Sequence, residues 1–120
     1  MPHTLIARLV EMNDSHGEVL WDAFVTAMLS AGPAEERRSR YGNKPALAIA
    51  GREVAHLEAP GVIDLRITRK GWSQAAEEYG RDAAVRRDPS RRDWIELHLR
   101  SEADLGRFNH LLVLVVANNT

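Results

Sequence analysis

Residues 51–68 constrain the fold more than any other stretch, because their pattern predicts a β-hairpin. This stretch reads GREVAHLEAPGVIDLRIT and has proline and glycine at its middle, where the chain must reverse. Its second half alternates strictly, so Ile63, Leu65 and Ile67 face one side while Asp64 and Arg66 face the other. A hairpin alone is only marginally stable in water. The chain must therefore place further strands or a helix against the apolar side.

Two more segments have strand patterns. Residues 46–50 form a short apolar run that ends at Gly51, a residue typical of a tight turn or a bulge. Residues 94–100 alternate cleanly, with Ile95, Leu97 and Leu99 on one side. Every clear strand has a half-buried pattern rather than a continuous apolar run, which favours antiparallel pairing. We therefore expect a mostly antiparallel sheet of about four strands.

Helical patterns surround these strands. Apolar residues recur at helical spacing in residues 3–12, 18–30 and 69–79, and the sequence NDSHG at 13–17 predicts a break between the first two helices. Residues 34–44 have no apolar period and are typical of a charged loop. Ser101 opens a capping-box-like motif, and the helix that follows buries an apolar stripe. The β-branched run at its end, residues 111–116, also allows an extended tail.

The order of these elements predicts an α+β fold with helices packed on one face of the sheet. The 120 residues fit a single domain. Within it, residues 1–44 supply the N-terminal helices and the charged connector, and residues 45–117 supply the sheet and the C-terminal helices.

Composition excludes several kinds of protein. Sixteen basic and seventeen acidic residues give a net charge of −1, so nothing global attracts the chain to nucleic acid or to an anionic membrane. The absence of cysteine excludes disulfides, thiolate catalysis and cysteine metal sites. The N-terminus lacks the basic region of an export signal, and the apolar run at 111–117 is too short to span a bilayer. We therefore expect a cytoplasmic protein that does not enter a membrane.

If the last strand pairs beside the hairpin, the outward side chains of three strands share one polar surface. The candidate catalytic residues on it are His56, Asp64, Glu96 and His98, and the candidate ligand-binding residues are Arg66, Arg100 and Trp94. Histidines and carboxylates between arginines can perform general acid/base chemistry, because neighbouring charges move their pKa values toward neutrality. Arg66 would orient an anionic or enolic ligand through paired donors. The alternative is a solvated face of cross-strand ion pairs, each worth under about 1 kcal/mol.

The same polar residues do not predict a metal site. Two histidines and a carboxylate can bind iron or zinc. However, the chain has no HExxH or HxH motif, and the candidate residues come from separate strands. The sequence therefore leaves any cofactor unknown.

A local basic loop offers a different kind of partner. Arginines at 81, 86, 87, 91 and 92 can meet the phosphates of a nucleic acid or a nucleotide. Three aspartates dilute this charge, and no aromatic residue lies among the arginines to stack a base. Nucleic-acid binding is therefore an alternative that the composition disfavours.

Three motifs carry a resemblance to a known family: GREVAHLE from Gly51, VIDLRI from Val62, and WIELHLRSEADLGR from Trp94. On these motifs residues 45–117 resemble the small luciferase-domain family, a largely uncharacterised group related at the domain level to fungal luciferase. Fungal luciferase oxidises a hydroxypyrone with oxygen, a reaction that a small domain of this type need not share. The stretch from Leu57 to Gly61 lacks the second histidine and the Asp-Gly turn that the family often carries, and the tail lacks its Ala-Tyr ending.

The sequence thus leaves three functions open. The first is binding or transformation of a small anionic or enolic ligand on the polar sheet face. The second is a non-enzymatic interaction module, which self-associates as a homo-oligomer or docks a partner through the sheet edge or the exposed face. The third is nucleic-acid binding through the 81–92 loop. Whether the chain is an enzyme is not decided by these patterns.

Overall fold

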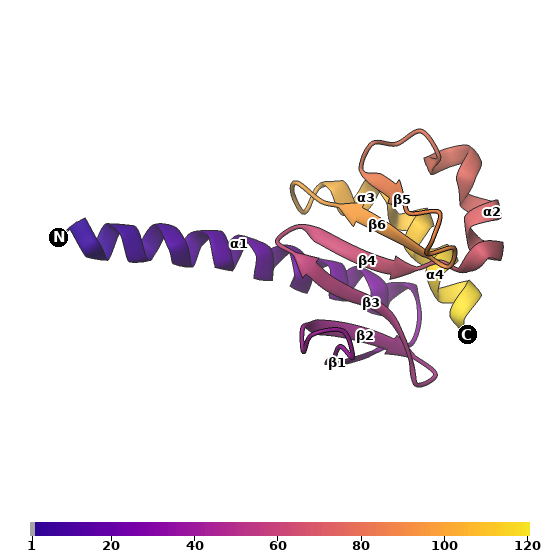
Figure 1. Cartoon of the computed structure of the whole chain (residues 1–120), viewed down its shortest axis with the longest axis horizontal. Helices are drawn as coiled ribbons and strands as arrows, with labels where there is room; N and C mark the ends of the chain where they lie inside the picture. The colour runs from indigo at the N-terminus through magenta and orange to yellow at the C-terminus, as the bar shows by residue number, and fades with distance from the viewer. Residues whose placement is uncertain (1) are drawn as a thin grey trace.

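A computed structural model describes residues 2–120, with side chains described from residue 17 onward (Figure 1). The helices are α1 (Pro2–Ala31), α2 (Thr68–Tyr79), α3 (Asp104–Arg107) and α4 (Asn109–Asn119). The strands are β1 (Glu35–Arg38), β2 (Pro45–Ile49), β3 (Arg52–Ala59), β4 (Val62–Arg66), β5 (Val85–Arg87) and β6 (Trp94–His98). The fold is α+β, as the sequence predicts.

The strands form one antiparallel sheet in the order β1-β2-β3-β4-β6-β5. The predicted hairpin is its centre, because β3 and β4 pair around the turn at Pro60 and Gly61. The predicted strand at 94–100 lies beside this hairpin as β6. The three segments on which the polar surface depends are therefore neighbours.

The helices cover one face of this sheet. In Figure 1 α1 and α4 pass behind the strands, and the N-terminal part of α1 extends beyond the sheet. α4 contacts α1, α2 and the two central strands. The fully buried side chains between these layers include Phe24 and Met28 of α1, Leu65 of β4, and Leu111 and Leu112 of α4. The apolar alternation of the hairpin and β6 thus points into a core, and the polar alternation points to the uncovered face.

The sheet has six strands, whereas the sequence predicts about four. The two additional strands are β1, with the sequence EERR, and β5, with the sequence VRR. Both lie at the edges of the sheet and carry charged, mostly exposed side chains. Edge strands pair through their backbones while charged side chains remain in water, so they show no apolar period.

The predicted break between two N-terminal helices is wrong, because α1 is a single helix from Pro2 to Ala31. Gly17, the last residue of the predicted break, instead permits close packing. A Cβ at this position would lie 3.2 Å from Cβ of Pro60 in the hairpin turn. The glycine therefore brings α1 against the turn. His3 and His16 lie outside the residues whose side chains are described.

The C-terminal segment is helical to Asn119 rather than extended. Its β-branched residues Val115 and Val116 are buried. The packing of these side chains in the core outweighs the weak preference of valine for extended backbone.

The two glycines that flank β3 provide a matched test of the hairpin. Gly51 and Gly61 both have left-handed backbone, with φ of +78° and +74°. A Cβ on Gly61 would lie 2.6 Å from the carbonyl oxygen of Leu99, whereas a Cβ on Gly51 would have no described atom within 4 Å. We expect Gly51→Ala to lower the free energy of unfolding by about 1–2 kcal/mol. Gly61→Ala should cost about 1–3 kcal/mol more, because rigid backbone must move.

Urea unfolding of both variants, followed by circular dichroism, measures this difference. Equal losses at the two positions would contradict the close approach of Gly61 to the end of β6.

Candidate functional site

One row of cross-strand partners crosses the uncovered face of the sheet. From β1 to β5 the row contains Arg37, Ala46, His56, Asp64, Glu96 and Arg86. Directly opposed residues in antiparallel strands point to the same face. The strand register therefore places His56, Asp64 and Glu96 on one face, as the alternation predicts.

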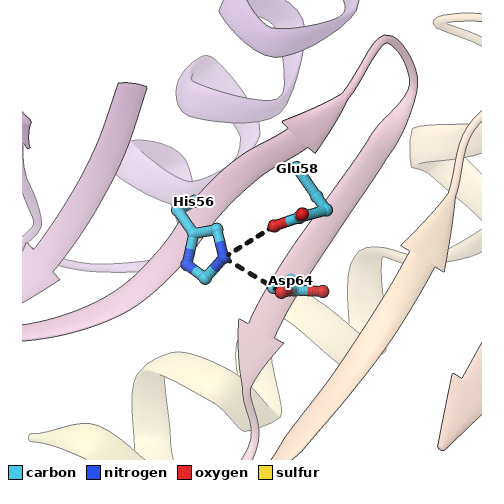
Figure 2. A group of neighbouring side chains, drawn as sticks. All are labelled: His56, Glu58 and Asp64. Carbon is cyan, nitrogen blue, oxygen red and sulfur yellow. Dashed lines mark hydrogen bonds and ion pairs between the residues drawn. The ribbon is translucent and has the colours of Figure 1, made fainter. Parts of the chain in front are cut away.

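His56 lies at the centre of this row and is surrounded by carboxylates. Its Nε2 atom is 2.9 Å from Asp64 Oδ2 and 3.2 Å from Glu58 Oε2 (Figure 2). Its Nδ1 atom is 3.1 Å from Glu53 Oε2. Ionised carboxylates only accept hydrogen bonds, so both ring nitrogens must donate. The arrangement therefore favours the imidazolium cation.

A β-bulge brings Glu53 to His56. The pairing of β2 with β3 shifts between Leu47 and Ala48, so Ala46 opposes His56 while Ala48 opposes Glu53. The extra residue puts Glu53 and His56 on the same face although they are three positions apart, whereas regular alternation would separate them. The two small alanines opposite them leave room, and His56 and Glu53 are only 3% and 8% exposed.

Glu53 is itself held by the segment after β1. The hydroxyl of Ser39 donates to Glu53 Oε2 at 2.9 Å, and the backbone N–H of Arg40 donates to Oε1 at 3.2 Å. Ser39 is buried as well. These bonds fix the carboxylate that accepts the hydrogen bond from His56 Nδ1–H, and they thereby orient the imidazole ring.

Aromatic rings and an arginine surround the imidazole. The ring centroids of Tyr41 and Trp94 lie 5.7 Å and 5.6 Å from that of His56. Arg91 places its guanidinium 5.4 Å from the Trp94 ring and donates to Asp64 Oδ2 at 3.2 Å. The loop between β5 and β6 therefore reaches back over the sheet face.

These groups enclose a hollow of about 910 Å³ above the sheet. Its lining comes from β3, β4 and β6, from the segment after β1, from the start of α2 and from the β5–β6 loop. The lining residues are Tyr41, His56, Glu58, Asp64, Arg69, Pro89, Ser90, Arg91, Arg92, Asp93 and Trp94.

The charges in the site shift two pKa values. The close contact with Asp64 raises the pKa of His56 above 6.5, and it outweighs the opposing effect of burial. The charges of Glu53 and Glu58 raise this pKa further. Burial alone would raise the pKa of Asp64, but His56 and Arg91 together lower it below 3.8. An imidazolium has no lone pair, so His56 in this state can donate a proton but cannot act as a base.

The other predicted site residues lie apart from His56. Glu96 and His98 share its face but contact each other, with His98 Nε2 2.6 Å from Glu96 Oε1. Arg66 donates to Asn119 Oδ1 at 2.6 Å, which ties β4 to the end of α4. Arg100 follows β6, and its backbone N–H donates to Asp104. Of the seven predicted residues, the structure brings together His56, Asp64 and Trp94.

Sequence reasoning missed four residues that surround His56. Glu58 is two positions along the same strand, so alternation could have identified it. Glu53 is hidden by the bulge, which leaves no periodic signal. Tyr41 and Arg91 come from loops, and only tertiary structure shows that they reach the sheet.

Comparison of the chain with protein-family models, with curated proteins and with solved structures gives no match. The resemblance to the luciferase-domain family therefore stays a prediction. Among the described residues, no helix combines the length and the apolar character that crossing a membrane requires.

The His56 cluster should make stability depend on pH. The pKa of His56 is raised in the folded state, so its contribution is complete below pH 6.5 and is lost as the pH rises through the folded-state value. The pKa of Asp64 is lowered, so its contribution is present above pH 3.8 and is lost as the pH falls through the folded-state value. We expect the free energy of unfolding to decline on the alkaline side by at most about 1.4 kcal/mol per pH unit.

Urea unfolding of the wild type and of His56→Gln between about pH 6 and 9 tests this expectation. The variant should be less stable at neutral pH and should lack most of the alkaline decline. If it declined as steeply as the wild type, the pH dependence would come from other groups.

Proposed function

We propose that the hollow above His56 binds a small anionic or enolic molecule. The observation that carries this proposal is the convergence of a buried, fully hydrogen-bonded histidine, two aromatic rings and three arginines on one cavity. The cavity volume of about 910 Å³ lies within the range of small-molecule sites. Solubility alone does not require a polar group as deeply buried as His56.

The rim supplies the positive charge for such a ligand. Arg69, Arg91 and Arg92 line the hollow, and a guanidinium can bind two oxygens of a carboxylate, phosphate or enolate at once. Arg91 also lies over Trp94, so its planar group is partly oriented before the ligand arrives.

The walls supply a surface for a flat ligand. Trp94 and Tyr41 both place aromatic rings next to His56, and ring stacking favours planar, conjugated molecules. This chemistry agrees with the anionic or enolic ligand expected from the sequence. The proposal covers binding alone.

Arginine substitutions test the proposal directly. The probes are a 3-hydroxy-4-pyrone, an aromatic carboxylate and a sugar phosphate, each titrated calorimetrically into the wild-type protein. We expect at least one probe to bind, and we expect Arg91→Ser and Arg92→Ser each to weaken it roughly tenfold or more, because each removes a charged hydrogen-bond donor.

Arg92→Ser leaves the contact between Arg91 and Asp64 in place, so it separates ligand binding from the integrity of the cluster. The matched control is Arg81→Ser, which removes the same charge from an exposed position after α2. Equal weakening by the control would indicate only a general electrostatic effect. Failure of all three probes to bind at about 1 mM would contradict the proposal.

A further inference from the structure

Three side chains on the floor of the hollow have the donor atoms of a metal site. His56, Glu58 and Asp64 each offer one ligand atom, and these three atoms lie within 4.8 Å of one another. His56 Nε2 is 2.9 Å from Asp64 Oδ2 and 3.2 Å from Glu58 Oε2. Ligands held about 2.1 Å from an ion are about 3.0 Å apart at right angles and about 3.4 Å apart in a tetrahedral site. The two distances from Nε2 are thus close to those between neighbouring ligands of one ion, and both carboxylates face Nε2 (Figure 2).

The surroundings of His56 match those of a metal-bound histidine. Such a histidine almost always donates its other ring N–H to a carboxylate or carbonyl, which fixes the tautomer and orients the ring. Here Nδ1 lies 3.1 Å from Glu53, and Glu53 is held by Ser39 and by the Arg40 N–H. These hydrogen bonds orient the imidazole ring so that Nε2 points toward Asp64 and Glu58.

Asp64 provides an independent observation. Its side chain is buried, with 3% exposure, and among the described residues none donates a hydrogen bond to its Oδ1 atom. A buried acceptor without a partner is costly, and in native structures it often marks a bound ion or water. An ion bound through both carboxylate oxygens, or a water on an ion bound through Oδ2, would give Oδ1 a partner.

We propose that His56, Glu58 and Asp64 bind one divalent transition-metal ion, with Zn²⁺ as the test ion. One imidazole nitrogen and two carboxylate oxygens suit Zn²⁺ or Mn²⁺, and three protein ligands leave a position open toward the hollow. Arg91 and Lys44 now contact the two carboxylates, at 3.2 Å and 3.3 Å. Their side chains are 43% and 37% exposed, so either one can move away from its carboxylate when the ion binds.

This inference deepens the proposed function, on which it rests for the role of the ion, since an anionic ligand would occupy the open position. Metal binding itself is measured without any organic ligand. The two proposals can therefore be refuted separately. Absence of Zn²⁺ binding would not change the expected effect of the arginine substitutions, and failure of every organic probe would not change the result of the Zn²⁺ titration.

Calorimetric titration of tag-free, chelator-treated protein with ZnCl₂ tests the site, and the visible spectrum of the Co²⁺ form reports its ligand set. We expect one ion per chain. Glu58→Gln should weaken Zn²⁺ binding at least tenfold, and His56→Gln at least a hundredfold. Glu53→Gln, which changes a positioning residue, should weaken it about 10–100-fold and alter the Co²⁺ spectrum.

Glu58 is 44% exposed, so Glu58→Gln should fold even if substitution of the buried His56 does not. The matched control is His98→Gln, which removes a histidine from a second His–Glu pair on the same sheet face. The proposal is supported if this control binds Zn²⁺ like the wild type. It is overturned if Zn²⁺ does not bind, if Glu58→Gln binds as tightly as the wild type, or if His98→Gln weakens binding equally.

Discussion

In the central hairpin His56 lies opposite Asp64, and Ala55 lies opposite Leu65. Side chains alternate along each strand. A shift of the β3–β4 register by one residue would therefore move the side chains of one strand to the opposite face of the sheet. Asp64 would then enter the apolar core without hydrogen-bond partners, at a cost of several kcal/mol, while Leu65 would lose its burial. The polar contacts on one face of the sheet and the apolar core on the other therefore favour the same strand register. β2 and β6 extend the sheet from the two sides of this hairpin, so the position of every other strand depends on it.

The buried polar cluster is tolerated because its charges balance. Three carboxylates, those of Glu53, Glu58 and Asp64, face the imidazolium of His56, while Lys44 and Arg91 contact two of them. The sum is three negative and three positive charges. A divalent ion that replaced the Nε2 proton and one of the two exposed cations would leave this sum unchanged. The same neutrality can thus be reached with or without a metal, which makes exchange between the two states electrostatically feasible.

Sequence periodicity predicted the parts of this fold whose burial is regular. The hairpin, β6 and α2 all have clear alternation or a helical stripe, and each lies where the pattern places it. It failed for β1 and β5, because strands at the sheet edge need no apolar side chains. It also missed Glu53, because a single inserted residue reverses the face on which a side chain lies. Tyr41 and Arg91 reach the site from loops, and their positions depend on tertiary contacts that have no local signature.

The charged edges have a consequence for how this sheet behaves in a crowded solution. β1 carries only glutamate and arginine, and it shields β2, whose sequence PALAI is uncharged and mostly buried. An uncharged strand with an open backbone edge presents unpaired N–H and C=O groups that a strand of another chain can bind. The four residues of β1 pair with this edge of β2 and so prevent another strand from binding there. Detachment of this outer strand would leave that edge of β2 open to pairing with a strand of a second chain.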